Sequence, residues 1–383
     1  MVTINSAEQA LKTVYLDVVA NQLNTEINPF LAKIKQSTQD VWGKEVRKLA
    51  PIGINGGVGA GTEDGALPSA HGNRYVQFVS TLKNLYGQIE ISDKAIRASE
   101  NSTGAFVNLL NAEMEGLIKA SSFNLGRMLY GDGTGKLCEV SSVTGSLVVV
   151  DNVRNCVEGM VVDAYTPSGL KCATAQIHSI DRDANTLYLS SGKDISTGMF
   201  LTVQGSLNNE ITGLGAIFAE QGTLYGIDRN SNPWLKPYVK NINGEITESA
   251  IQSVIDRLEE VNGSKVDFIL CSAGVKRAFQ ELMSSYKRNI DVMELNGGYK
   301  ALTYNGIPLV SDRFVAPGEM YLLNSKDFHL HQLCDWKWLE NENGRILHQN
   351  AGKATYSATL VKYAELVCDH PGGQAKLTGI QEA

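Results

Sequence analysis

The sequence predicts an α+β fold, and three observations lead to this prediction. Apolar residues repeat at three- and four-residue steps between Phe106 and Met128, which is typical of one long helix. Residues 137–204 instead carry short β-branched runs at close, regular spacing, separated by turn residues. Beyond Thr247 the helical and strand patterns are mixed. The chain has 383 residues, 43% of them apolar and 20% charged, which is enough for two or three domains with a substantial core.

The N-terminal segment, residues 1–44, is expected to be a helical arm. Polar and apolar residues alternate at helical spacing over 5–35, which indicates one or two amphipathic helices. Pro29 would close the first helix or open the second. An arm of this length has little core of its own, so we expect it to pack on another part of the molecule or on a neighbour.

Residues 45–91 are expected to form an extended β-loop with a glycine-rich tip. The segments 45–54 and 74–91 have strand character, whereas 55–73 is too rich in glycine for a helix and too polar for a core. A loop of this length inside a compact domain usually contacts something else. We therefore list as candidate intersubunit contacts Gly56, Gly57, Gly59, Glu63, Asp64 and Arg74.

Residues 92–136 carry the strongest helix signal in the chain. Ser102 or Thr103 can cap this helix, which continues to about Tyr130. At 1.5 Å per residue it would be roughly 40 Å long, well above the average helix. A helix of this length is suited to act as a strut.

The rest of the chain divides into three further segments. Residues 137–220 read as an inserted all-β domain, a small barrel or sandwich, and 221–352 as a mixed α/β domain. In the mixed domain we expect a helix capped by Thr247, a strand at 266–270, a second helix and a hairpin turn at Asn305-Gly306. The segment 353–383 opens with a long alternating strand at 353–369, which is expected to be the last regular element.

The stretch "RMLYGDGTGK", residues 127–136, invites comparison with a phosphate-binding loop because it is glycine-rich and ends in Gly-Lys. The phosphate loop needs a glycine where Tyr130 stands and a Ser or Thr where Leu137 stands, and it opens a helix instead of closing one. We interpret the stretch as the end of the long helix, capped at Gly131 and followed by a turn at Asp132–Gly133.

Two further patterns fail their motifs. In 56–61, Gly57 and Gly59 begin a dinucleotide-binding pattern whose third glycine is replaced by Thr62. The segment 181–186 begins like a calcium loop, but Thr186 occupies the required glycine and no Glu closes the loop. A hairpin turn explains that segment better.

The metal and redox candidates are equally weak. His329 and His331 would share one face of a strand and could ligate a metal, but the sequence identifies no third ligand. The six cysteines are scattered without a C-x-x-C pair, which indicates reduced thiols. They are Cys138, Cys156, Cys172, Cys271, Cys334 and Cys368. No nucleophile elbow and no catalytic carboxylate pair stands out, so we expect no enzyme, no cofactor and a structural protein.

The composition of the chain argues against two kinds of partner, nucleic acid and membranes. The formal net charge of −7 and the lack of a basic tract argue against tight, non-specific binding of nucleic acid. No window reaches the ~18 apolar residues of a membrane span, and the N-terminus lacks the pattern of a signal peptide.

Taken in order, these elements resemble the major capsid protein of tailed bacteriophages, the Hong Kong ninety-seven type of fold. The resemblance rests on the arm, the extended loop, and "ISDKAIRAS" leading into the long helix that ends "LYGDGTG", which looks like the family's spine helix. It continues through "YNGIPLVSDRFVAPGEMYLLN", similar to the family's axial domain, and "ATYSATLVKYAELV", which looks like the strand returning through the peripheral domain. The inserted β domain resembles insertions that some capsid subfamilies carry.

The resemblance implies many copies assembled as pentamers and hexamers of an icosahedral shell around double-stranded DNA, without sequence-specific binding. It implies a virion protein made in the bacterial host cytoplasm, a portal protein as partner, and room for a decoration protein. Two departures matter: the tip at 55–73 has no lysine, so the self-catalysed Lys-Asn cross-link of the family's type member is not expected there. No long charged segment precedes the arm, so we expect a separate scaffolding protein.

Two alternatives stay open. An encapsulin-type nanocompartment resembles the same fold but packages an enzyme. An enzyme with its site between the inserted barrel and the α/β part is the alternative from a different class.

Overall fold

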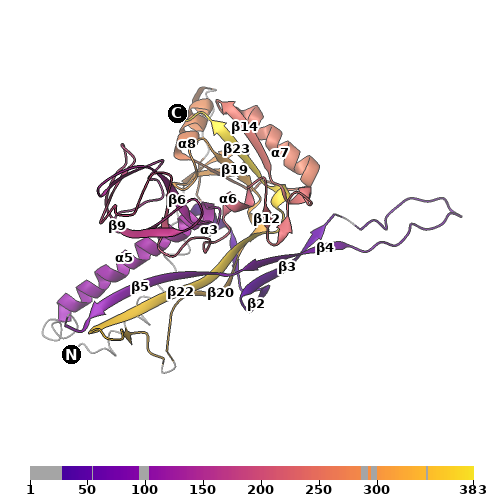
Figure 1. The fold of residues 1–383 in the computed structure, drawn as a ribbon. Helices are drawn as coiled ribbons and strands as arrows, with labels where there is room; N and C mark the ends of the chain where they lie inside the picture. Colours follow the sequence, from indigo (N-terminus) through magenta and orange to yellow (C-terminus); the bar gives the residue numbers. More distant parts are fainter. Residues whose placement is uncertain (1–27, 54, 95–102, 286–291, 295–299, 342–343) are drawn as a thin grey trace.

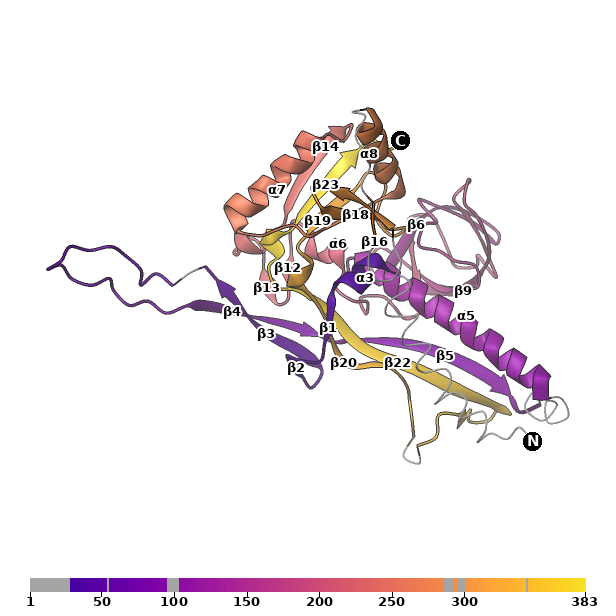
Figure 2. The same ribbon diagram turned by 180° about the vertical axis from the view of Figure 1, so that it is seen from behind.

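The computed structural model describes residues 28–53, 55–94, 103–285, 292–294, 300–341 and 344–383. The helical pattern predicted at 5–27 and the cap predicted at Ser102 lie outside these residues. The described chain confirms the α+β class. A two-stranded arm projects to one side, a long helix runs above two long strands on the other, and a sheet with two helices and a small barrel lie above them (Figures 1 and 2).

The lower layer is a sheet covered on one face by the long helix. Its path is β1–β20–β22–β21, with β5 paired to β22. The strands are β1 (Lys35–Ser37), β5 (Lys83–Ser92), β20 (Phe328–Trp338), β21 (His348–Gln349) and β22 (Thr355–Cys368). Helix α5 (Thr103–Tyr130) has the predicted extent. It lies so close to β5 that a Cβ on Gly87 would stand 2.8 Å from a methyl of Leu117, so a larger residue there would require the Leu117 side chain to move.

The short helix α3 (Pro29–Lys33) settles the role of the proline that the sequence left open. Pro29 occupies the first turn, where its missing N–H costs no hydrogen bond. The side chain of Asn28 accepts hydrogen bonds from the backbone N–H of Phe30 and of Leu31. Pro29 therefore opens a helix, and Phe30 packs edge-on against Phe328 in the main core.

The upper layer is a seven-stranded sheet with order β14–β23–β19–β15–β18–β17–β16. These strands are β14 (Tyr238–Gly244), β15 (Phe268–Cys271), β16 (Val292–Glu294), β17 (Lys300–Tyr304), β18 (Ile307–Ser311), β19 (Met320–Leu323) and β23 (Ala375–Ile380). Its helices are α7 (Glu248–Asn262) and α8 (Ala273–Ser285). Thr247 caps α7 through its side chain as predicted, and Asn305 and Gly306 turn the β17–β18 hairpin with positive φ.

One prediction about the end of the chain is wrong. The strand β22 is not the last regular element, because β23 (Ala375–Ile380) follows it. β23 lies inside the upper sheet, parallel to β14 and antiparallel to β19. Ala375 and Leu377 are completely buried there, so the final strand belongs to the core of this layer.

The inserted β domain is a closed six-stranded barrel with order β10–β7–β6–β11–β8–β9. Its strands are β6 (Lys136–Thr144), β7 (Leu147–Val150), β8 (Val161–Tyr165), β9 (Lys171–Asp181), β10 (Thr186–Leu189) and β11 (Phe200–Val203). The calcium-like segment is the predicted hairpin turn, in which the Asp181 carboxylate accepts the N–H groups of Asp183 and Ala184. After the barrel, helix α6 (Leu214–Ile217) returns to the main core.

Candidate functional site: the projecting arm and its supports

The arm is a ribbon of two antiparallel strands, β3 (Glu45–Ile52) and β4 (Arg74–Thr81), extended at its base by β2 (Val41–Trp42). The register runs from Glu45 opposite Thr81 to Ile52 opposite Arg74. The remaining tip reaches well beyond the rest of the molecule (Figure 1). The structure places all six predicted contact residues on this arm: Gly56, Gly57, Gly59, Glu63, Asp64 and Arg74. Five of them are exposed and Gly57 is half-buried.

The glycines of the tip serve close approach of its two limbs. A Cβ on Gly59 would stand 3.2 Å from the ring of Pro68, and one on Gly57 would stand 3.4 Å from the backbone of Ser69. Two glycines of the arm have positive φ, Gly43 in the turn between β2 and β3 and Gly53 at the end of β3. Glu63 and Asp64 lie in the turn between these limbs.

One face of the ribbon exposes three large apolar side chains among polar ones, and sequence reasoning missed them. Residues directly opposite in an antiparallel pair share a face, and every second residue along a strand does so too. By the observed register, Trp42, Leu49 and Tyr75 therefore lie on the same face. Their exposed fractions are 69%, 64% and 53%. We call these three residues the apolar arm face.

The opposite face of the arm is anchored in the body near its base. Phe78 is buried and stacks with the ring of Trp234, 6.1 Å between centroids, and contacts Tyr225 at 5.3 Å. The Val79 N–H donates to the Tyr225 carbonyl, and the Tyr225 hydroxyl donates to the Leu366 carbonyl in β22. The base of the arm is thus held firmly, while the segment beyond it projects freely.

A polar cluster adds to this anchor. The Lys48 ammonium lies 2.6 Å from the Asp369 carboxylate, and His329 Nδ1 lies 3.3 Å from the same carboxylate. Burial opposes ionisation of Asp369, but the hydrogen bonds from His329 and Lys48 outweigh it and hold its pKa below the ordinary value. Burial lowers the pKa of His331, whose Nδ1 lies 2.8 Å from the Gln39 carbonyl oxygen.

The two histidines do share a face, with ring centroids 5.9 Å apart. His329 contacts Asp369, which pairs with Lys48 of the arm, and His331 contacts the Gln39 carbonyl, so both histidines link β20 to the base of the arm. Among the described residues, no group of three or more His, Cys, Asp and Glu side chains is arranged to hold a metal ion.

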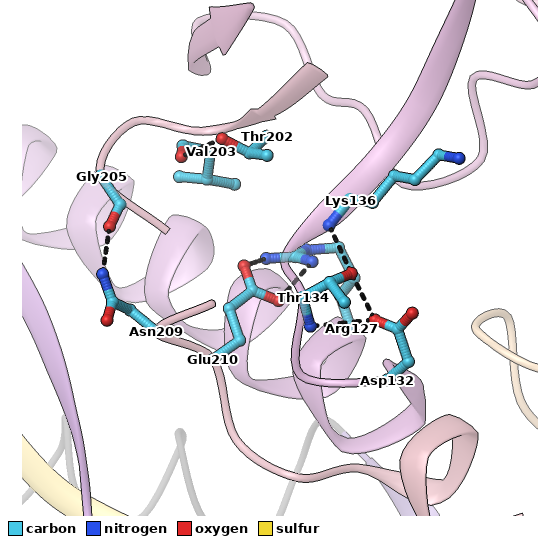
Figure 3. A network of polar contacts seen from close by, with 9 residues as sticks. All are labelled: Arg127, Asp132, Thr134, Lys136, Thr202, Val203, Gly205, Asn209 and Glu210. Carbon is cyan, nitrogen blue, oxygen red and sulfur yellow. Dashed lines mark hydrogen bonds and ion pairs between the residues drawn. The ribbon is translucent and has the colours of Figure 1, made fainter. Parts of the chain in front are cut away.

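The glycine-rich stretch after the long helix connects α5 to the barrel (Figure 3). The predicted cap at Gly131 is only partly right: its N–H donates to the Met128 carbonyl, but it does not adopt positive φ. Gly133 and Gly135 do, at 84° and 81°. The Lys136 ammonium, the lysine of the phosphate-loop pattern, is paired with the Glu139 carboxylate.

The two chain segments that lead into and out of the barrel contact each other directly. Arg127 at the end of α5 forms a two-point ion pair with Glu210, at 2.8 and 2.5 Å, and both side chains are almost fully buried (Figure 3). The Asn208 N–H donates to the Thr134 carbonyl. Gly213 packs on the end of α5, where a Cβ would stand 2.3 Å from the Met128 carbonyl oxygen. This junction therefore fixes the barrel relative to the long helix.

A cleft of about 1270 Å³ lies between α5 and the barrel, where the sequence placed its enzyme alternative. Phe123, Met160 and Phe314 contribute apolar surface to it. The Arg182 guanidinium donates two hydrogen bonds to the Glu158 carboxylate, so these two charges in the cleft wall satisfy each other. The cleft gives this alternative a location, and Glu113, Lys119 and Arg313 also line it.

Residues 175–357 match the family model described as SU10 major capsid protein. The Cyanophage A-1(L) capsid asymmetric unit has a similar fold, with a TM-score of 0.56 and 14% identity over 94% of this chain and 92% of that chain. The capsid of Myoviridae Phage XM1 matches with a TM-score of 0.47 and 9% identity, over 93% of this chain and 92% of that chain.

An encapsulin of Synechococcus elongatus, in the holo-SrpI complex, matches with a TM-score of 0.46 and 13% identity, over 95% of both chains. No curated protein matches this chain. None of the described helices is long and apolar enough to cross a membrane.

Proposed function

We propose that this chain is a major capsid protein of the tailed-bacteriophage type and that its projecting arm locks neighbouring subunits of the shell together. The match of residues 175–357 to the family model and the similar fold of the cyanophage capsid support the first part of the proposal. In this proposal the tip at 55–73 lies across an adjacent copy and the apolar arm face packs on it. The shell consists of pentamers and hexamers with icosahedral symmetry, and it encloses double-stranded DNA.

The observation that carries the proposal is the apolar arm face. An isolated two-stranded ribbon is marginally stable in water and gains stability by packing against another element. Trp42, Leu49 and Tyr75 are each more than half exposed, although full burial of a large apolar side chain is worth about 1.5–3 kcal/mol. In a shell built from copies of one chain, the surface next to each arm is another copy.

The test replaces the three side chains of the apolar arm face with serine. We expect Trp42→Ser, Leu49→Ser and Tyr75→Ser together to leave a folded, soluble subunit that no longer closes into shells. The matched control replaces Leu170 and Val261 with serine, because these lie elsewhere and are 67% and 66% exposed. The control should assemble normally, as judged by electron microscopy and sedimentation. Closed shells from the triple variant would contradict the proposal.

A second variant separates the tip from the apolar arm face. Deleting residues 56–66 shortens the tip and leaves the β3–β4 register from Glu45 to Ile52 intact. We expect soluble subunits with an unchanged melting temperature that fail to form closed shells. Normal shells would show that the tip is dispensable.

The contents of the particle distinguish the capsid from a nanocompartment. The net charge of −7 is consistent with a shell that encloses DNA without binding it tightly. Nucleic-acid analysis of purified virions should find double-stranded DNA inside shells of this chain, whereas a cargo enzyme would favour the encapsulin alternative.

Several finer points remain part of the proposal. The division at residues 44, 91, 136, 220 and 352, the scaffolding and portal partners, a decoration protein and synthesis in the host cytoplasm all follow from the resemblance. So does the absence of catalysis; specific, saturable binding of a metabolite by the purified subunit would argue for the enzyme alternative.

A further inference from the structure

A buried histidine lies under the base of the arm, where β20 meets the turn that leads into β2. The side chain of His331 is 1% exposed, and its Nδ1 lies 2.8 Å from the Gln39 carbonyl oxygen. A carbonyl oxygen only accepts, so Nδ1 carries the hydrogen and Nε2 is the basic atom of the neutral ring. Nε2 has no hydrogen-bond partner within the described ranges. A proton added at Nε2 would therefore create a buried cation whose new N–H has no acceptor there.

Two carboxylates of the neighbouring strand offer this cation little compensation. Asp369 already pairs with the Lys48 ammonium at 2.6 Å and with His329 Nδ1 at 3.3 Å. Glu365 is directly opposite His331 in the β20–β22 register, so the two residues share a face of the sheet. Burial raises the pKa of Glu365 to about 7, so this carboxyl becomes neutral over the pH range in which a histidine gains its charge.

The other charged groups around His331 act in both directions. Burial is the largest influence and lowers the pKa of His331 below its ordinary value of 6.5, and Lys48 and His329 lower it further. The hydrogen bond to the Gln39 carbonyl and the charge of Asp40 raise it, but they do not outweigh burial. The folded arm base therefore favours the neutral ring.

The turn that His331 contacts connects the body to the arm. Gln39 and Asp40 lie between β1, which pairs with β20, and β2, which pairs with β3. Asp40 has a positive φ of 63°, and its carbonyl accepts the Arg47 N–H of β3 at 2.9 Å. Loss of the contact between His331 and Gln39 would therefore loosen the β2–β3 side of the ribbon. The β4 side keeps its separate anchor through Phe78.

We propose that His331 makes the base of the arm sensitive to acid: a proton taken up by its ring releases the turn at Gln39 and Asp40 and loosens β2 and β3 from the body. Because the folded pKa is the lower one, the stability of the closed turn is fully present above pH 6.5 and is lost as the pH falls through the folded value. The use of this device rests on the proposed function, since an arm that loosens in acid holds a neighbouring subunit less firmly.

The test measures amide hydrogen exchange by mass spectrometry on purified, unassembled subunits at about pH 7.5 and about pH 5.5. Rates are corrected for the intrinsic effect of pH. We expect exchange over residues 39–48 to accelerate by up to about tenfold at the lower pH, because protonation favours the open turn. Amides of the barrel should keep their corrected rates. Because free subunits are measured, a negative result would leave the proposed function of the arm standing.

Two variants and one further measurement complete the test. His331→Asn keeps an amide N–H near the position of Nδ1 and never becomes charged, so the acceleration should disappear. His178→Asn, at an exposed histidine of the barrel, should behave as wild type.

Should His331→Asn fail to fold, deuterium uptake at the histidine C2 position gives the titration of each ring in the wild type. His331 should titrate at lower pH in the folded protein than in the urea-unfolded chain. Equal corrected exchange at both pH values, acceleration that spreads equally over the barrel, acceleration that persists in a folded His331→Asn, or an unchanged titration of His331 would each overturn the proposal.

Discussion

Glu365 should make the stability of the subunit depend on pH. Its side chain is completely buried in β22, where Oε1 accepts the Thr212 N–H at 2.8 Å. Oε2 has no hydrogen-bond partner among the described residues. Burial raises the pKa of Glu365 from 4.5 to about 7, although the bonds from Thr212 oppose the change. The folded protein therefore favours the protonated carboxyl.

The magnitude follows from the two pKa values. One pH unit corresponds to about 1.36 kcal/mol, so a rise from 4.5 to about 7 represents about 3 kcal/mol of linked free energy. Because the folded pKa is the higher one, this stability is fully present below pH 4.5. It is lost as the pH rises to about 7, since the unfolded chain then releases a proton that the folded chain retains.

Glu365→Gln isolates this contribution. Glutamine stays neutral at every pH and keeps an oxygen that can accept the Thr212 N–H, whereas all other titrating groups are common to both proteins. We expect the variant to gain about 2–3 kcal/mol of unfolding free energy relative to wild type between about pH 5 and pH 8. Urea unfolding of unassembled subunits at both pH values measures it. An equal difference between the two proteins at both pH values would refute the reasoning.

Three further predictions concern the supports of the arm and the barrel. Arg127→Ala leaves the Glu210 carboxylate buried without its partner and should cost about 3–5 kcal/mol of unfolding free energy in urea titration; a loss below 1 kcal/mol would contradict this. Gly213→Ala must displace the carbonyls at the end of α5 and should lower the melting temperature, whereas Gly116→Ala, in open space within the same helix, should raise it slightly. A melting temperature lower for Gly116→Ala than for Gly213→Ala would refute this explanation. Tyr225→Phe removes the hydroxyl that donates to β22 and accepts from it and should cost about 1–3 kcal/mol, measured by calorimetry; an unchanged transition would contradict the anchoring role.

Local periodicity was enough to predict most of the regular elements. The helix at 103–130 and the barrel strands carry strong repeats at the periods of helix and strand, so their type could be read from the chain. β23 was missed because it is short, contains Gly379 with positive φ, and has as its sheet neighbours β14 and β19, which are distant in sequence. No local sequence pattern in residues 370–383 predicts a strand that is buried inside a sheet.

The candidate site shows the same limit. Glycine content located the tip, but Trp42, Leu49 and Tyr75 come from three separate strands. Only the register of β2, β3 and β4 places them on one face. A large apolar residue on the polar side of an alternating strand is the signal that could have identified Leu49. The strand pairing is needed to show which of these apolar residues lie together on one face.

The closed barrel and the open ribbon differ in whether they present unpaired strand edges to neighbouring copies of the protein. A closed barrel presents no unpaired strand, so copies packed at high density cannot extend one another's sheets through it. The ribbon keeps open margins, since within the described residues β2 and β4 are the outer strands of its sheet. Strand addition at the projecting ribbon would therefore join copies at the part of the molecule that reaches furthest, whereas loops of the barrel can vary without creating a new edge strand.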